Sequence, residues 1–256
     1  MHKTFAFAER NGKEILRDPL SYVFCVAFPL VMLAVMTLVD QSIPPQAGMT
    51  IFHIENLSGG IMVFGLTFVM LFTAITVAKD RSSAFLMRMY ATPMTSFDFV
   101  AGYLLPMLGI ALAQGVLIGV VSLAVSALMG QPLAVTGLLL AMVTLIPVAV
   151  LFIALGLIFG TLFNEKAAPG ICSVVISLGS FLGSIWFDAE NTGGVLLDIS
   201  RCLPFHYCTK AVRAAIQLKL TWQALWLPLC VVIGCAALLI LVAALVFHQR
   251  MKAELA

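Results

Sequence analysis

The sequence predicts an all-α membrane protein with six transmembrane helices. Of its 256 residues, 62% are hydrophobic and 10% are charged, and the mean hydropathy is +1.09. Soluble domains carry about a quarter of charged residues, so this chain lies far outside their range. Six long apolar stretches follow one another along the sequence. We therefore interpret residues 1–256 as a single transmembrane domain.

Each apolar stretch is long enough to cross the membrane, because about 20 apolar residues span the hydrocarbon as a helix. The predicted spans are residues 20–39, 57–78, 100–129, 133–163, 168–187 and 223–247. Only Gly130, Gln131 and Pro132 separate the third and fourth spans, which indicates a tight helical hairpin. Its helices project from the membrane or kink near Pro106 and Pro147. No A-x-A-like cleavage site follows the first span, so we expect it to be retained.

Lysine and arginine residues between the spans predict the orientation, because cytoplasmic loops carry an excess of them. Ten fall on one side: Lys3, Arg10, Lys13, Arg17, Lys79, Arg81, Arg88, Lys166, Arg250 and Lys252. The first and third connections hold none, and the fifth is long enough to weaken the rule. We therefore expect a multi-pass protein of the cytoplasmic (inner) membrane with both termini in the cytoplasm.

An amphipathic helix is predicted over residues 3–17, before the first span. Its apolar side carries Phe5, Ala8, Gly12, Ile15 and Leu16. The opposite side carries Lys3, Glu9, Arg10, Lys13, Glu14 and Arg17. We interpret it as an interfacial helix with its cations at lipid head groups; a solvated amphipathic helix is the alternative. Asp18 and Pro19 then end the helix and turn the chain toward the membrane.

A charged segment, residues 79–99, interrupts the apolar sequence between the second and third spans. A short helix is predicted over 80–92, capped by Asp80 or Ser82, with Arg81 and Arg88 on one face. Phe85 and Met89 form an apolar ridge on this helix, and Pro93 stops it. Residues 95–98 then have the form of a capping box. Such a helix either fits a groove in another protein or is a charged turn that fixes topology.

The last connection, residues 188–222, is long and its second half is amphipathic. One face carries Cys208, Ala211, Val212, Ala215 and Ile216, and the other carries Lys210, Arg213 and Gln217. We expect the segment 204–219 to lie at or dip into the outer membrane surface, either as a gate or as a passive cap. The predicted gate residues are Pro204, Ala211, Arg213 and Ala215. Cys202 and Cys208 are either a disulfide or two free thiols.

The sequence lacks the residues that several other classes of membrane protein need for their function. The six apolar stretches contain no Asp, Glu, Lys, Arg or His, which disfavours an ion-coupled transporter. No H-E-x-x-H, G-x-S-x-G or zinc-like spacing of Cys and His occurs, so a membrane hydrolase is disfavoured. No G-x-x-x-x-G-K-[ST] occurs either, so energy for active transport must come from another chain.

Three motifs together resemble the ABC-2 type exporter permeases. They are Ile15-Leu-Arg-Asp-Pro19 followed by Phe28-Pro29, Leu86-Met-Arg-Met-Tyr-Ala-Thr-Pro93, and Leu203-Pro-Phe-His-Tyr-Cys-Thr-Lys-Ala-Val-Arg213. The resemblance covers nearly the whole chain. It implies a dimerising transmembrane subunit that docks on two ATPase subunits, with the charged segment as coupling helix. Family members carry acids where Ser82 and Met87 stand and a glycine where Ala84 stands, which weakens charge-based docking there.

The resemblance assigns ATPase coupling to ten residues. They are Asp80, Arg81, Ser83, Phe85, Leu86, Arg88, Met89, Tyr90, Thr92 and Pro93. It also implies that this chain binds no cofactor and is not an enzyme, since ATP and Mg²⁺ are held by the partner ATPase. The second permease is a copy of this chain or a different one, and membrane lipid is a further partner, whereas nucleic acid is not.

The expected function is export of an amphipathic cargo, drug-like, lipid-like or peptide, at the expense of ATP. The apolar stretches offer Met, Phe, Ser and Thr but no charge, which suits such a cargo. Polysaccharide export within the same family is an alternative, although three Trp and four Tyr offer few platforms for sugars. A secondary transporter or channel, a membrane-embedded enzyme and a structural scaffold are the other hypotheses.

Overall fold

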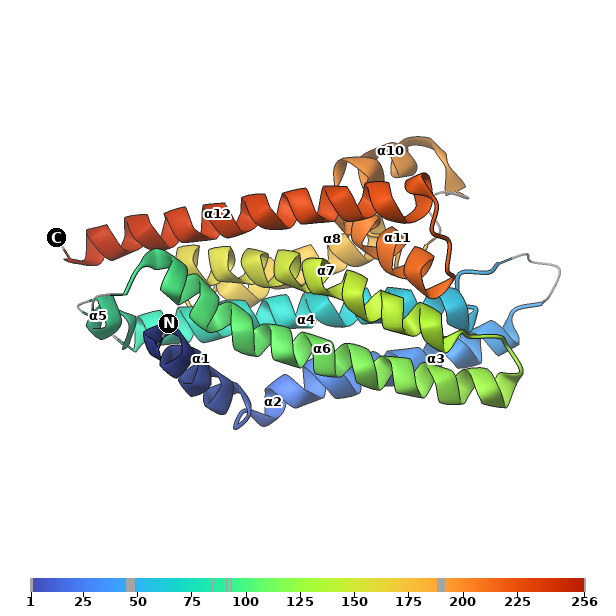
Figure 1. The fold of residues 1–256 in the computed structure, drawn as a ribbon, viewed down its shortest axis with the longest axis horizontal. Coiled ribbons are helices and arrows are strands. Elements are labelled where there is room, and N and C mark those ends of the chain that lie inside the picture. The colour runs from blue at the N-terminus through green and yellow to red at the C-terminus, as the bar shows by residue number, and fades with distance from the viewer. Residues whose placement is uncertain are drawn as a thin grey trace.

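The computed structural model describes residues 2–44, 49–83, 85–90, 92, 94–187 and 192–255, and every regular element in these ranges is a helix (Figure 1). The elements are α1 (His2–Ile15), α2 (Pro19–Tyr22), η1 (Val23–Ala27), α3 (Phe28–Ser42), α4 (Ile54–Ser82), α5 (Phe85–Tyr90), α6 (Ser96–Met129), α7 (Val135–Leu162), α8 (Ala168–Leu182), α10 (Gly194–Cys202), α11 (Pro204–Ile216), η3 (Trp222–Trp226) and α12 (Leu227–Leu255). The predicted all-α class is confirmed.

Five helices in the described ranges are long and apolar enough to cross a membrane. They are Pro19–Ser42, which joins α2, η1 and α3, then α4, α6, α7 and the helix Trp222–Lys252. The predicted sixth span, residues 168–187, is not among these five helices, because its helix, α8 (Ala168–Leu182), has only 15 residues. An α-helix rises about 1.5 Å per residue, so α8 alone is shorter than the hydrocarbon of a bilayer. The chain is a multi-pass membrane protein.

Helix α4 is the centre of the bundle. Of its most apolar window, 83% of the residues are buried, against 22% in the first and last of the five long helices. Helix α7 lies against it at close range. A Cβ atom on Gly156 would lie 2.4 Å from the carbonyl oxygen of Met70, and one on Gly160 would lie 2.5 Å from that of Ala74. Two glycines four residues apart therefore allow backbone contact between the two helices, as in other membrane bundles.

The predicted hairpin between the third and fourth spans is confirmed. Helix α6 ends at Gly130, whose φ of 65° belongs to the left-handed region, and α7 begins five residues later and packs back on α6. Glycine adopts that conformation without a steric penalty. Both helices continue past their internal prolines, Pro106 and Pro147.

The two ends of the bundle differ in what they carry. The N- and C-termini and α5 lie at one end, whereas α10, α11 and the connection between α3 and α4 lie at the other (Figure 1). Helix α1 packs along α6 at the first of these ends. Its Phe7 and Ile15 are buried, but Phe5 and Leu16 of the predicted apolar side are 60% and 61% exposed. The predicted apolar side of α1 is therefore only partly buried: Ile15 packs in the bundle, whereas Phe5 and Leu16 are exposed.

Candidate functional site

The predicted coupling helix is shorter than expected. Helix α4 continues through Ser82, and the separate short helix, α5, covers only Phe85–Tyr90. Asp80 and Arg81 therefore belong to the last turn of α4, and the predicted cap at Asp80 or Ser82 is wrong. The apolar run and the first four residues of the charged segment, 79–82, form one continuous helix, because nothing at residues 78–82 breaks it.

Asp80 is buried and holds an ion pair. Its side chain is 2% exposed and faces Arg10 of α1, with Nη1 donating to Oδ2 at 2.7 Å and Nη2 to Oδ1 at 3.0 Å. The Tyr103 hydroxyl donates to Oδ2 at 2.8 Å. Burial lowers the pKa of Arg10, but the hydrogen bonds to Asp80 together with the charges of Asp80 and Glu14 outweigh it and raise this pKa above its ordinary value. This carboxylate binds α1, α4 and α6 together.

Phe85 is partly buried and packs against α1. Its ring stacks on Phe7 of α1 with centroids 6.3 Å apart, and the Arg10 guanidinium lies 4.0 Å from the centre of the Phe85 ring. A cation over an aromatic face is attracted by the ring quadrupole. Phe7 also meets Tyr103 at 5.0 Å, edge to face. Helix α5 is thereby held to α1, and α1 to α6.

Some of the other predicted coupling residues contact the rest of the chain, and others lie on the surface. Leu86 is fully buried and Met89 packs against the core, whereas Arg88 is exposed. Arg81 donates from Nη1 to the carbonyl oxygen of Thr161, and the Ser83 hydroxyl donates to the carbonyl oxygen of Asp80 at 3.1 Å. The Thr92 hydroxyl donates to the Met89 carbonyl at 2.6 Å, the Tyr90 side chain lies outside the described atoms, and Pro93 lies outside the described residues.

The predicted capping box at the start of α6 is confirmed. The Asp98 backbone N–H donates to the Thr95 hydroxyl, while the Asp98 carboxylate accepts from the Thr95 backbone at 2.9 Å. Thr4 of α1 donates to the same carboxylate at 2.6 Å. Helix α1 therefore reaches the first turn of α6 as well as the last turn of α4.

The sequence pattern alone does not single out Phe7, Arg10 or Tyr103. Arg10 stands on the polar side of an amphipathic helix, where the pattern predicts contact with head groups or water. Its partner Asp80 is 70 residues away. The sequence does hold one signal of this contact. Asp80 directly follows an apolar run, and a carboxylate in such a place needs a cation close by.

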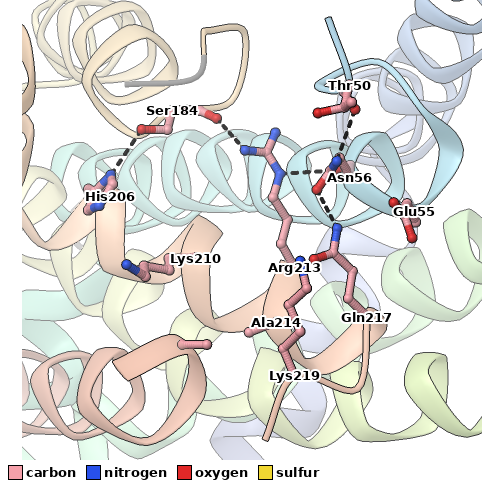
Figure 2. A pocket seen from close by; sticks show the side chains of 11 residues that line it. Thr50, Glu55, Asn56, Ser184, His206, Lys210, Arg213, Ala214, Gln217 and Lys219 are labelled. Carbon is pink, nitrogen blue, oxygen red and sulfur yellow. Dashed lines mark hydrogen bonds between the residues drawn. The ribbon is translucent and has the colours of Figure 1, made fainter. Parts of the chain in front are cut away.

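The opposite end of the bundle contains α11 and its arginine. Arg213 donates from Nε to the Asn56 carbonyl at 2.9 Å and from Nη1 to the Ser184 carbonyl at 2.7 Å (Figure 2). Its Nη2 donates to the Ile185 carbonyl at 3.1 Å. Gln217, one turn later, donates to the Asn56 side chain at 2.6 Å. Helix α11 is therefore fastened to the start of α4 and to the turn after α8.

The predicted gate residues lie on both sides of α11. Pro204 begins the helix, where a missing N–H is tolerated. Ala211 and Ala215 are fully buried, and α11 packs against α4, α7 and α12. The apolar side of α11 thus packs against these helices. The expectation that the segment 204–219 lies at the outer membrane surface, as a gate or as a passive cap, stays a prediction. Cys202 and Cys208 are free thiols.

The described residues offer no group of three or more His, Cys, Asp or Glu side chains that could hold a metal ion. Helices are instead attached at both ends of the central helix α4. Helices α1 and α5 are attached near its last turn, and α11 is attached near its start. Compared with protein families, residues 2–216 match the family model described as ABC-2 type transporter. A comparison with curated proteins gave no match.

Proposed function

The chain belongs to the ABC-2 type transporter family, and from this premise we propose that it is the permease subunit of an ATP-binding-cassette exporter. In this proposal a separate ATPase subunit binds ATP and Mg²⁺, and this chain binds no nucleotide. The sequence supports the division of labour, because it has no phosphate-binding P-loop. A second permease, identical or different, completes the transporter.

The observation that carries the proposal is the attachment of α5. This helix lies at the end of the bundle, and Phe85 joins it to Phe7 and Arg10 of α1. Arg10 in turn joins Asp80, which belongs to the central helix α4. A displacement of α5 by a docked ATPase would therefore reach α4 and, through it, α6, α7, α8 and α11. Chains of packed side chains and ion pairs are the physical means by which such coupling travels.

Six crossings are part of the proposal. The two termini lie at the same end of the bundle (Figure 1), which requires an even number of crossings. Five long helices alone would leave the termini at opposite ends. We assign the sixth crossing to α8 completed by α10 and α11, which continue the chain to the far end. The end with the termini then faces the cytoplasm, as the lysine and arginine count predicts.

The proposed cargo is amphipathic. Polar groups buried inside the long helices include Thr67, Thr73, Gln114, Ser122 and Thr144, none of which carries a charge. Thr67, Thr73 and Thr144 donate to carbonyl oxygens of their own helices. Gln114 donates to the Met62 carbonyl of a neighbouring helix, and these neutral groups add no fixed charge to the bundle. This composition supports a cargo with a large apolar part.

The test begins with the partner. We expect the full-length chain, purified from its native membranes, to retain an ATPase subunit, and ATP hydrolysis by the reconstituted complex to rise when cargo is present. A secondary transporter or channel would move cargo without that subunit and without ATP. Transport by the chain alone in ATP-free vesicles would contradict the proposal.

A further inference from the structure

A polar pocket of about 440 Å³ lies between α11 and the start of α4 (Figure 2). The residues that matter here are Glu55, Lys210, Arg213 and Lys219, which all line it. Glu55 belongs to α4, Lys210 and Arg213 belong to α11, and Lys219 follows α11. The hydrogen bonds from Arg213 attach α11 to the start of α4 and to the turn after α8. The pocket is therefore a built feature of this end of the bundle.

Cations outnumber anions among the described residues of this pocket. Of the Lys, Arg, Asp and Glu residues that line it in the described part of the chain, three are cations, Lys210, Arg213 and Lys219, and one is an anion, Glu55. Since the apolar side of α11 is buried in the bundle, its cationic side is turned into the pocket. Figure 2 shows Lys210 and Glu55 on opposite sides of Arg213. A ligand with an anionic group at one end and a hydrogen-bond donor at the other fits this arrangement.

The surroundings place the pocket at the depth of lipid head groups. Just after α11, Leu218 and Leu220 are 43% and 53% exposed, and Trp222 and Trp226 are 62% and 47% exposed. Lys219 and Ala224 of the same segment line the pocket. Exposed tryptophans are enriched where the hydrocarbon meets the head groups. The pocket thus adjoins an apolar surface at the membrane boundary.

We propose that this pocket binds the phosphate head group of an anionic membrane lipid. The lysines donate to the phosphate oxygens, Glu55 accepts from a head-group hydroxyl, and the acyl chains lie along Leu218, Leu220 and Trp222. Lysine is a point-charge donor suited to phosphate, and long-chain lipids supply the apolar part that a free anion lacks. The inference does not depend on the transport proposed above.

The test compares lipids on the full-length chain. Phosphatidylglycerol and phosphatidylcholine are titrated onto the detergent-purified protein, and bound lipid is measured by native mass spectrometry. We expect phosphatidylglycerol to bind more tightly than phosphatidylcholine. The double substitution Lys210→Gln and Lys219→Gln should weaken phosphatidylglycerol binding about 25-fold, because each lysine near an anionic lipid contributes about fivefold in affinity. Lys210→Arg with Lys219→Arg keeps the charge and should keep most of the affinity.

The matched control is Arg201→Gln, which removes an exposed cation of α10 outside the pocket. It should leave phosphatidylglycerol binding unchanged. Equal weakening by Arg201→Gln, or no preference of the unsubstituted protein for phosphatidylglycerol, would overturn the proposal. Displacement of the lipid by millimolar inorganic phosphate would identify a free anion as the ligand and overturn the lipid assignment.

Discussion

The Arg10 guanidinium and the Asp80 carboxylate meet through two hydrogen bonds, of 2.7 and 3.0 Å, although 70 residues separate them. The pair is asymmetric, because the side chain of Arg10 is 36% exposed and that of Asp80 only 2%. Without Asp80, Arg10 keeps its pair with Glu14 at 2.7 Å and can also reach water. Without Arg10, the buried Asp80 carboxylate is left with the Tyr103 hydroxyl as a donor. This asymmetry gives the first prediction.

We expect Arg10→Gln to destabilise the protein more than Asp80→Asn. Removing Arg10 leaves a buried carboxylate with Tyr103 as its hydrogen-bond donor, and the free energy of unfolding should fall by about 2 to 3 kcal/mol. Denaturant unfolding in detergent micelles measures it. The control is Lys13→Gln, which breaks an exposed pair with Glu9 and should cost under about 0.5 kcal/mol. Equal losses for Arg10→Gln and Lys13→Gln would refute a buried pair.

Phe85→Ala should uncouple ATP hydrolysis from export. The substitution removes the ring on which Phe7 stacks and over which Arg10 lies, so α5 loses its attachment to α1. An aromatic pair contributes about 0.5 to 1.5 kcal/mol to stability, and a cation–π contact contributes about 0.5 to 2 kcal/mol. Cargo-stimulated hydrolysis and ATPase pull-down in reconstituted membranes measure the effect.

Two comparisons sharpen that experiment. Phe5→Ala truncates an aromatic residue of α1 that is 60% exposed, and it should leave coupling intact. Arg88→Ala removes an exposed cation of α5 and should have a smaller effect than Phe85→Ala. Full coupling in Phe85→Ala would mean that α5 is a charged turn rather than a coupling helix.

Gly156→Ala should loosen the contact between α4 and α7. Its new Cβ would lie 2.4 Å from a backbone oxygen of Met70, so one helix must move. Overpacking of this kind typically costs about 1 to 3 kcal/mol. Thermal unfolding is the measurement, and Gly234→Ala of α12, which meets no atom within 4 Å, is the control. If the two variants unfold alike, the helices do not pack as closely as the structure has them.

Arg213→Lys should release α11 from α4 and α8. A lysine cannot donate to the three carbonyls that the planar guanidinium reaches, and those of Ser184 and Asn56 would lose charged donors. We expect a loss of about 2 kcal/mol and faster amide hydrogen exchange in α11. Arg201→Lys serves as the control. Unchanged exchange in α11 would show that Arg213 does not fasten it.

Topology is tested with single cysteines in a cysteine-free background. Ser83→Cys should react with a membrane-impermeant thiol reagent only from the cytoplasm, and Met49→Cys, at a residue that is 50% exposed, only from outside. Met49 is chosen because Ala47, in the middle of that connection, lies outside the described residues. Reaction of both from one side would contradict the six-crossing arrangement.

The amino-acid sequence alone predicts the all-α membrane class and the local turns and helix caps. Composition and the length of the apolar runs predict membrane helices, since the bilayer imposes both requirements on each segment separately. The capping box at Thr95 and Asp98 and the turn at Gly130 are likewise local, and both are present. Each of these depends on residues within a few positions of one another.

Only the tertiary structure decided which polar residues are buried and what they bind. Arg10 and Arg213 both stand on the polar sides of amphipathic helices, yet one pairs with Asp80 and the other binds three carbonyls. A helical pattern says which face is polar, but the partner of that face comes from distant segments of the chain. Whether a charge meets water or a buried partner is therefore settled by packing, which no local pattern contains.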